Sequence, residues 1–141
     1  MDMLLKQKRI FIVEDNIMNR VVYREILTAH GAFIVTDRWG RDTLPTLKEQ
    51  RHIDIIILDL MLPNGISGFG IFETLRSHSD FDAIPIVAVS AMEPSIAIPK
   101  AQELGFSGFI AKPIDEEIFP QQIADILQGT QVWHDGQLLK R

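Results

Sequence analysis

Carboxylate, hydroxyl and ammonium side chains follow apolar runs at four places in this sequence. Glu14 and Asp15 follow "RIFIV", Asp59 follows "IIIL", Ser90 ends "IPIVAVS" and Lys112 follows "GFIA". Each residue alone has a purely structural explanation, as an acid that ends a strand, a hydroxyl that caps a helix or a solvated lysine. Their repeated position after an apolar run instead predicts that the five side chains share one site.

Three carboxylates beside an ammonium indicate phosphoryl chemistry. Packed carboxylates repel one another, and one of them takes up a proton unless a cation offsets the charge. Because the candidate ligands are oxygen atoms without His or Cys, the cation that fits best is Mg²⁺. Transfer of a phosphoryl group depends on charge neutralisation and positioning, which Mg²⁺, Lys112 and Ser90 would supply. One acid could then be the nucleophile that forms an acyl phosphate, and Asp59 is the candidate because it ends the most apolar run.

A sheet must bring these distant side chains together. Apolar runs typical of buried strands cover residues 9–15, 32–37, 53–59, 84–90 and 108–112. Helices are expected over 18–29, 40–51 and 67–77, and in a last segment opened by the acids at 115–117. This alternation predicts an α/β fold with a single doubly wound, five-stranded parallel sheet and helices on both faces. Ligands bind beyond the carboxyl ends of such strands, where the five polar residues lie.

Proline and serine refine three of the expected helices. Pro45 must lie early in helix 40–51 or kink it, and Ser67 is a candidate N-cap of helix 67–77. Pro99 lacks an N–H and would clash with the carbonyl group four residues before it. We therefore expect the helix after the fourth strand to be short, kinked or partly unwound.

The overall composition fits one globular domain and argues against several classes of function. The 141 residues suffice for one core, and we expect a domain over 1–128 with a C-terminal extension or linker over 129–141. The net charge of −5, from 14 basic and 19 acidic residues, argues against direct binding of nucleic acid or of an anionic membrane. Cysteine is absent, which excludes disulfides and thiolate metal sites. Because no apolar run could span a membrane and the start lacks a secretory signal, we expect a cytoplasmic protein.

The ordered set of polar motifs resembles one protein family. The motifs are the acidic pair at 14–15, "DLMLP" from Asp59, "SA" at 90–91 and "KP" at 112–113. The spacings are 44 residues from Asp15 to Asp59 and 22 residues from Ser90 to Lys112. This pattern resembles the receiver domains of two-component response regulators over about residues 8–128. The resemblance implies a CheY-like, or flavodoxin-like, fold with strand order 2-1-3-4-5.

The resemblance also implies a role for each acid. Asp59 would be the phosphoacceptor. Asp15 and Asp59 would bind Mg²⁺ directly and Glu14 would bind it through water. The Met61 carbonyl group would complete the protein ligands.

Further positions match the family pattern. Ser90 and Lys112 would hold the phosphoryl oxygens, and Ala91 is small enough to leave the group accessible. Phe109, three residues before the lysine, occupies the position of the family's switch aromatic, and the Lys112–Pro113 bond is expected to be cis. The helix after the fourth strand, the fifth strand and the last helix form the usual output face.

One loop departs from that pattern. The segment "NGISGFG" is one residue longer than usual and offers Ser67-Gly68 where the family usually places Asp-Gly. We expect a rearranged loop after the third strand, with the acids unchanged. Gly70 would lie inside the following helix, at a cost of about 1 kcal/mol relative to Ala.

The leading hypothesis is a stand-alone, phosphorylation-controlled signalling switch rather than an enzyme. It would take its phosphoryl group from a histidine kinase or a phosphotransfer protein, assist its own phosphorylation and slow dephosphorylation, and present a changed face to a downstream protein. A phosphorelay intermediate or the receiver of a hybrid kinase is a close variant, because "EDNIMNR", with Asn16 and Asn19, resembles such receivers. Met61 and Met92, which flank the phosphoryl group in this family, cannot orient water by hydrogen bonding, so we expect a long-lived phosphorylated state.

Three other functions fit the sequence less well. An aspartyl-phosphate hydrolase of the haloacid dehalogenase type needs a second acid two residues after the nucleophile, where this chain has Met61. A flavodoxin-like nucleotide binder needs a loop rich in hydroxyls and glycine after the first strand, where this chain has acids. A phosphate-independent interaction domain would retain the residues by descent, but nothing is missing from the site to support it.

Overall fold

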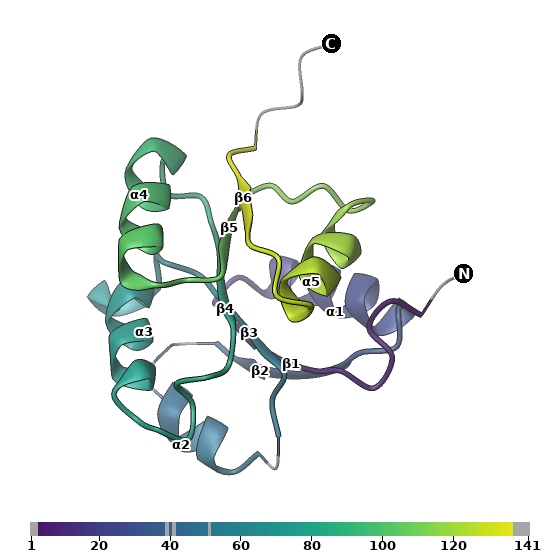
Figure 1. Ribbon diagram of the computed structural model, residues 1–141, viewed down its shortest axis with the longest axis horizontal. Helices are drawn as coiled ribbons and strands as arrows, with labels where there is room; N and C mark the ends of the chain where they lie inside the picture. The colour runs from purple at the N-terminus through teal and green to yellow at the C-terminus, as the bar shows by residue number, and fades with distance from the viewer. Residues whose placement is uncertain (1–2, 39, 41, 51, 137–141) are drawn as a thin grey trace.

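Strands and helices alternate along the chain in the computed structural model, which describes residues 3–38, 40, 42–50 and 52–136. The strands are β1 (Arg9–Val13), β2 (Phe33–Asp37), β3 (Ile55–Leu58), β4 (Ile86–Ser90), β5 (Gly108–Ala111) and β6 (Val132–His134). The helices are α1 (Ile17–Ala29), α2 (Thr43–Lys48), α3 (Gly68–Arg76), α4 (Pro94–Leu104) and α5 (Phe119–Leu127), with a 3₁₀ helix, η1 (Pro63–Gly65). This alternation confirms the predicted α/β class (Figure 1).

The described strands form one sheet in the order β2-β1-β3-β4-β5-β6, and each neighbouring pair is parallel. The predicted order of the first five strands is confirmed. The predicted number of five is wrong, because Val132–His134 pairs with the outer edge of β5. The sequence signal for β6 is weak, since only two apolar residues stand there among polar ones, whereas the edge of β5 offers unpaired backbone groups.

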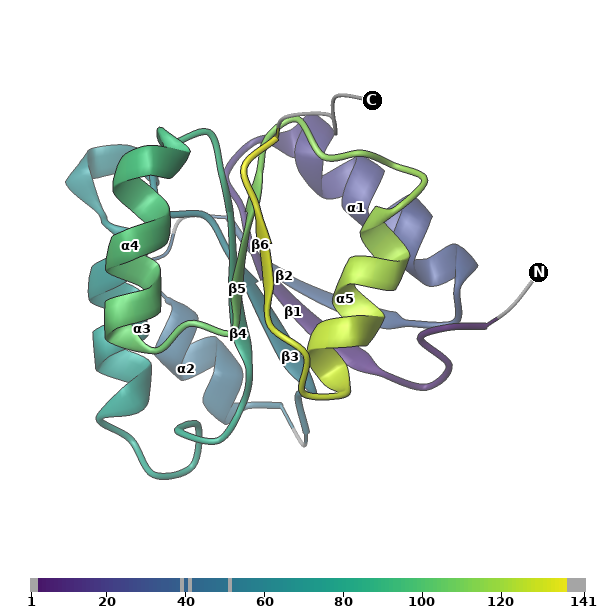
Figure 2. The same cartoon turned by 45° about the horizontal axis from the view of Figure 1, so that its top comes forward.

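Helices cover both faces of the sheet, as predicted. Helices α1 and α5 lie on one face, and α2, α3 and α4 lie on the other (Figure 1, Figure 2). Successive strand residues point to opposite faces, so Phe11 and Val13 of β1 join the apolar cluster under α2, α3 and α4, while Ile10 and Ile12 join the cluster under α1 and α5. Burial on both faces explains the continuous apolar runs. None of the described helices is both long and apolar enough to cross a membrane.

Local signals predicted some helix ends but not all. The Ser67 side chain accepts a backbone N–H of α3 at 3.1 Å and caps that helix, and Pro45 is the third residue of α2. Helix α5 begins at Phe119 rather than at the acids 115–117. The Asp115 carboxylate instead accepts the Glu117 N–H at 3.0 Å, which closes a turn before the helix. The expected start of the last helix is therefore corrected.

Helix α4 corrects the expectation drawn from Pro99. It is continuous over the eleven residues Pro94–Leu104. Pro99 and Ser95 both lie on the exposed side of the helix. Because Pro99 has no N–H, the Ser95 carbonyl group has no hydrogen-bond donor four residues later, and water can bind it instead. Ala97 and Ala101 pack on the inner side against the apolar cluster. Tertiary packing therefore maintains the helix despite the proline.

Candidate functional site

The five polar residues predicted to share a site lie at the carboxyl edge of the sheet. Glu14 and Asp15 follow β1, Asp59 follows β3, Ser90 is the last residue of β4 and Lys112 follows β5. Because β1, β3, β4 and β5 are successive parallel neighbours, their ends meet at one edge. The sheet thus brings together residues from four separate parts of the sequence.

Lys112 forms ion pairs with two of the acids. Its Nζ lies 2.7 Å from Asp59 Oδ2 and 2.7 Å from Glu14 Oε1. Glu14 and Asp59 are buried, with 1% and 4% of their surface exposed. Burial raises the pKa of Glu14 and outweighs the hydrogen bonds from Lys112 and the Asn16 N–H. Burial alone would lower the pKa of Lys112, but Asp59 and Glu14 together outweigh it and raise that pKa, so the ammonium stays charged.

The acid cluster fits a divalent cation. Glu14, Asp15 and Asp59 each offer one carboxylate oxygen, and these oxygens lie within 4.8 Å of one another. Three carboxylates against the ammonium of Lys112 leave an excess of two negative charges among these described side chains. Asp15 is exposed at the rim, which suits a hard ion that keeps several waters, such as Mg²⁺.

The backbone fixes two of the carboxylates. The Asn16 N–H donates to Glu14 Oε2 at 3.0 Å, and the Met61 N–H donates to Asp59 Oδ1 at 3.1 Å. These bonds set the directions in which the remaining lone pairs point. That the Met61 carbonyl group binds a metal stays a prediction.

Ser90 and Phe109 form the side of the site made by β4 and β5. Ser90 is fully buried, and its hydroxyl accepts the Met92 N–H at 3.3 Å. Its carbonyl group accepts the Lys112 N–H at 3.0 Å, so Ser90 and Lys112 are joined through the backbone. Phe109 is fully buried in β5, and the Lys112–Pro113 bond is cis, as expected.

Arg20 supports the acidic pair and was not anticipated from the sequence. From α1, its Nη1 donates to the carbonyl oxygens of Glu14 and Asp15, both at 2.8 Å. This contact holds the turn between β1 and α1 without neutralising the carboxylates themselves. The available sequence signal was a basic residue five positions after Asp15 and six after Glu14, which is close enough for a long side chain to reach their carbonyl groups.

The loop between β3 and α3 leads into Gly68, which the sequence singled out as a departure from the family pattern but not for its contact with Asp59. The loop contains η1, in which Asn64 and Gly65 have φ of 62° and 72°. The loop returns so that Gly68 packs on the backbone of Asp59, and a Cβ at Gly68 would overlap the Asp59 carbonyl oxygen. The close contact at Gly68 therefore fixes the position of the Asp59 backbone, and it forms only when the loop has folded.

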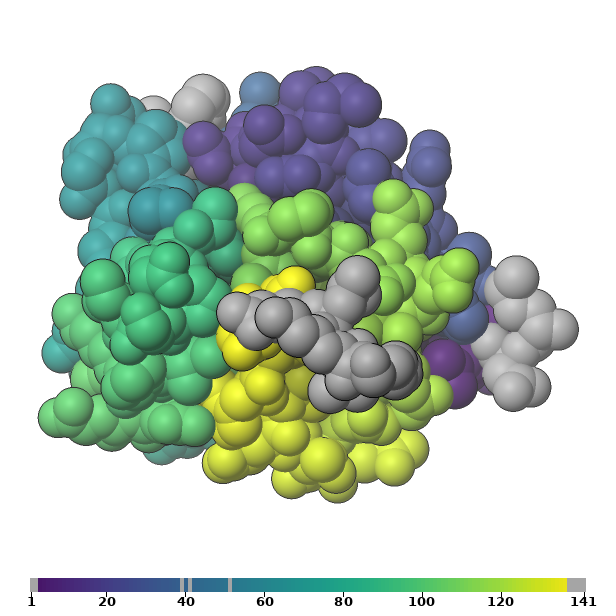
Figure 3. Space-filling view, turned by 90° about the horizontal axis from the view of Figure 1, so that it is seen from above, coloured from purple at the N-terminus to yellow at the C-terminus, as the bar shows by residue number. Residues whose placement is uncertain are grey.

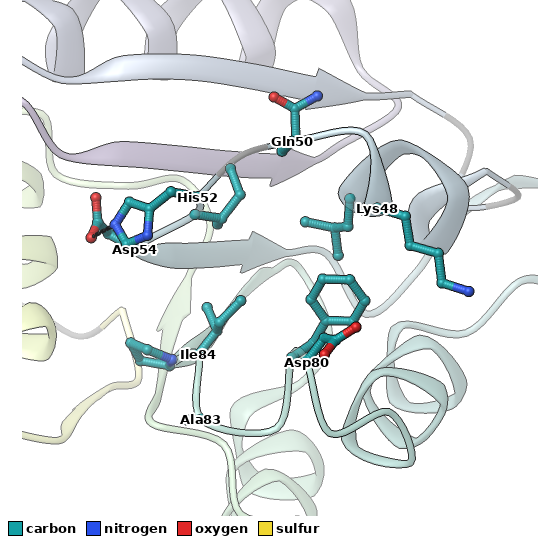
Figure 4. Close-up of a pocket in the computed structure, with 11 residues that line it drawn as sticks. Lys48, Gln50, His52, Asp54, Asp80, Ala83 and Ile84 are labelled. Carbon is teal, nitrogen blue, oxygen red and sulfur yellow. Dashed lines mark hydrogen bonds and ion pairs between the residues drawn. The ribbon is translucent and has the colours of Figure 1, made fainter.

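A separate pocket of about 510 Å³ lies at the opposite, amino end of the strands (Figure 4). His52 Nε2 lies 2.6 Å from Asp54 Oδ1, and the Arg9 N–H donates to Asp54 Oδ2 at 2.8 Å. Lys48 also lines the pocket but extends away from this pair in Figure 4. No group of three acids that could hold a cation occurs at this end among the described residues. In the described part of the chain, the group of acids that could hold a cation therefore lies at the carboxyl edge and not at this pocket.

Comparison with known proteins finds relatives of one kind. The family described as response regulator receiver domain matches residues 10–124. The polar-differentiation response regulator DivK of Brucella ovis is 30% identical over 120 residues, which cover 85% of this chain and 96% of DivK. A solved two-component response regulator of the LuxR family from Aurantimonas sp. SI85-9A1 is 27% identical with a TM-score of 0.79, covering 90% of this chain and 89% of that one.

A further solved relative has a metal in its site. It is the receiver domain of a sensor histidine kinase from Pseudomonas aeruginosa PAO1, with a magnesium ion coordinated in its active site cleft. The two chains are 24% identical with a TM-score of 0.75, and the match covers 88% of this chain and 99% of the other. At this identity the likeness concerns the fold.

Proposed function

The chain belongs to the response regulator receiver domain family, and from this premise we propose that Asp59 accepts its phosphoryl group. A receiver domain is a phosphoacceptor signalling switch of two-component systems, so the question is which carboxylate is modified. The observation that carries the assignment is the ion pair of 2.7 Å between Lys112 and Asp59, inside a cluster of three acids. Lys112 contacts Glu14 as well, but of the two paired acids Asp59 is the one whose strand lies between the strands that carry Glu14 and Ser90.

In the proposed reaction, an Asp59 carboxylate oxygen forms a bond to the phosphorus of a phosphohistidine. The bond between phosphorus and nitrogen breaks, its electron pair stays on the imidazole nitrogen, and that nitrogen takes up a proton from water. The Lys112 ammonium would exchange its ion pair with the Asp59 carboxylate for one with the phosphoryl oxygens, and the Ser90 hydroxyl would donate a hydrogen bond to these oxygens. The protein supplies position and charge rather than a second covalent step.

Glu14, Asp15, Asp59 and the Met61 carbonyl group would hold Mg²⁺ in this site. Bound there, Mg²⁺ would neutralise the excess of negative charge that otherwise repels an incoming phosphoryl group. The magnesium ion in the Pseudomonas receiver domain supports this choice of metal. The same residues would assist slow hydrolysis of the acyl phosphate, so the protein acts on itself and not as a general enzyme.

The phosphoryl donor proposed here is a histidine kinase or a phosphotransfer protein, and the recipient of the signal is a downstream protein in the cytoplasm. Residues 1–128 would form the phosphoacceptor unit, with 129–141 as an extension of it. The match to a receiver domain of a sensor kinase supports the receiver of a hybrid kinase or a phosphorelay intermediate as a second assignment. Neither assignment calls for direct contact with nucleic acid or membrane.

Intact-mass measurement after treatment with acetyl phosphate and Mg²⁺ tests the assignment. The wild-type chain should gain one phosphoryl group, and Asp59→Asn should gain none. Asp54→Asn is the matched control, because Asp54 precedes the same strand at its other end. An unchanged gain of mass in Asp59→Asn would show that the acceptor is elsewhere.

A further inference from the structure

The sixth strand has no part in the chemistry proposed for Asp59. It lies along the outer edge of β5, between α4 and α5 (Figure 1, Figure 2). Seen from above, the yellow end of the described chain lies beside the green atoms of α4 (Figure 3). Strand β6 therefore covers the edge of the strand that leads directly to Lys112.

Strand β6 pairs with β5, and close packing adds to that pairing. A Cβ at Gly108 would lie 2.5 Å from the Val132 carbonyl oxygen, so the absence of a side chain there lets the two strands approach. Trp133 lies opposite Phe109 and packs, partly buried, against the apolar cluster that contains Phe109 and Ala111. The strand is thus attached by its pairing with β5, by the close approach at Gly108 and by two partly buried side chains, Val132 against one apolar cluster and Trp133 against the other.

The attachment covers only a short length of β5. With three residues, β6 is shorter than a typical strand of about five or six. All three residues are only partly buried, and the Val132 N–H reaches the Ser107 carbonyl group at a long 3.4 Å. A small movement of β5 can therefore shift the balance between the attached and detached strand.

The segment after β6 reaches the neighbour of Lys112. A Cβ at Gly136 would lie 3.0 Å from the Cβ of Ala111, so Gly136 packs closely on that residue. Ala111 immediately precedes Lys112 and lies opposite Ser90 in the sheet. Gly136 therefore contacts the residue that precedes Lys112 and lies opposite Ser90, the two residues assigned to the phosphoryl oxygens.

We propose that residues 132–136 form a C-terminal strap that phosphorylation of Asp59 loosens. The inference rests on the proposed function, because transfer of the phosphoryl group is what redirects Lys112 and Ser90. In the structure the strap is attached while Lys112 contacts Asp59 directly, so attachment belongs with the unphosphorylated arrangement. Turning Lys112 and Ser90 toward the phosphoryl oxygens displaces Ala111 from under Gly136. By linkage, a strap that phosphorylation loosens must oppose phosphorylation while it is attached.

Hydrogen exchange followed by mass spectrometry tests the loosening on the full chain. Wild type and Asp59→Asn are each compared with acetyl phosphate and Mg²⁺ and with acetate and Mg²⁺. Amides of residues 130–136 should exchange roughly fivefold faster, or more, in phosphorylated wild type, with no change in Asp59→Asn. Labelled Asp59 with unchanged or slower exchange there overturns the strap alone, whereas no label on Asp59 overturns the proposed function and the strap with it.

Two variants test the reciprocal effect. Trp133→Ala removes the aromatic contact, and Gly108→Ala places a Cβ against the Val132 carbonyl group. Each should raise the ratio of phosphorylated to unphosphorylated chain roughly fivefold at equilibrium with a fixed mixture of acetyl phosphate and acetate. Phe33→Ala is the matched control, because Phe33 is an exposed aromatic in β2, the opposite edge strand, and it should leave that ratio unchanged. Faster exchange at 130–136 in either variant without a higher ratio overturns the coupling.

Discussion

The two ends of β3 each hold an aspartate, and their surroundings differ. Asp54, before the strand, has its own partners, since it accepts the Arg9 N–H and contacts the ring of His52. Asp59, after the strand, shares the single ammonium of Lys112 with Glu14, and Asp15 lies beside them. One carboxylate is satisfied locally and the other belongs to a group with excess negative charge. The same residue type therefore has a structural role at one end and, in the function proposed above, the role of phosphoacceptor at the other.

The largest expected difference between the two ends concerns the metal. Chelation of Mg²⁺ should slow phosphorylation of Asp59 by acetyl phosphate roughly a hundredfold or more, because three carboxylates then repel the phosphoryl group. Time courses of intact mass measure the rate. Asp15→Asn should show the same loss in the presence of Mg²⁺, and Asp54→Asn should behave like wild type. If the two variants behave alike, the contrast between the two ends disappears.

Removing the side chain that pairs with each aspartate should lower the free energy of unfolding by different amounts. Without Mg²⁺, Lys112→Ala should lower the free energy of unfolding by about 3 kcal/mol, because two buried carboxylates lose their cation. His52→Ala should lower it by less than about 1 kcal/mol, since the His52 side chain is 63% exposed. Urea unfolding followed by circular dichroism measures both. Mg²⁺ should restore part of the loss in Lys112→Ala, and equal losses in the two variants would contradict the comparison.

Two glycines of the same helix show how tightly the Asp59 end is packed. Gly68→Ala should lower the free energy of unfolding by about 2 kcal/mol and slow phosphorylation, because its Cβ overlaps the Asp59 carbonyl group. Gly70→Ala should raise the free energy of unfolding by up to about 1 kcal/mol, because its Cβ meets nothing within 4 Å. Thermal unfolding measures the change in stability of each variant. Destabilisation by both substitutions would mean that the contact with Asp59 is not the deciding factor.

The smallest effect concerns the lifetime of the phosphorylated Asp59. Met61 and Met92 lie next to the site, since their N–H groups donate to Asp59 and Ser90, and a thioether cannot direct a water by hydrogen bonding. The double variant Met61→Asn, Met92→Glu should lose its phosphoryl group about tenfold faster, as one new hydrogen bond of about 1.4 kcal/mol in the transition state would allow. The decay of intact mass after removal of the donor gives the rate. A decay as slow as in wild type would show that these side chains do not control access of water.

The position of the site followed from the sequence because it depends on short-range patterns. Each strand is an apolar run, and a parallel sheet places all the residues after such runs at one edge, so Asp59 and Lys112 could be brought together before any contact was known. The cap at Ser67 is likewise a local signal, fixed by a hydroxyl and an N–H two residues away. Where a few neighbouring residues decide the structure, the sequence is sufficient.

The features that the sequence did not predict depend on contacts between distant segments. Strand β6 exists because β5 has an open edge, and α4 stays regular through Pro99 because its inner side packs on the core. Gly68 touches Asp59 only after η1 has formed. None of these three contacts can be predicted from the residues next to them along the chain. Arg20 is different, because its partners lie only five and six residues before it and this spacing was a local signal.

The parallel direction of β6 determines where the chain leaves the sheet. Helix α5 runs back across the face, so a chain that ended its fold there would leave at the amino edge, where the pocket with His52 lies. Strand β6 returns the chain to the carboxyl edge, and residue 136 therefore emerges on the same side as Asp59. A fluorophore or tag joined after this point would be tethered beside the acid cluster of Glu14, Asp15 and Asp59, whereas one joined ahead of β1 would be tethered at the far side of the molecule.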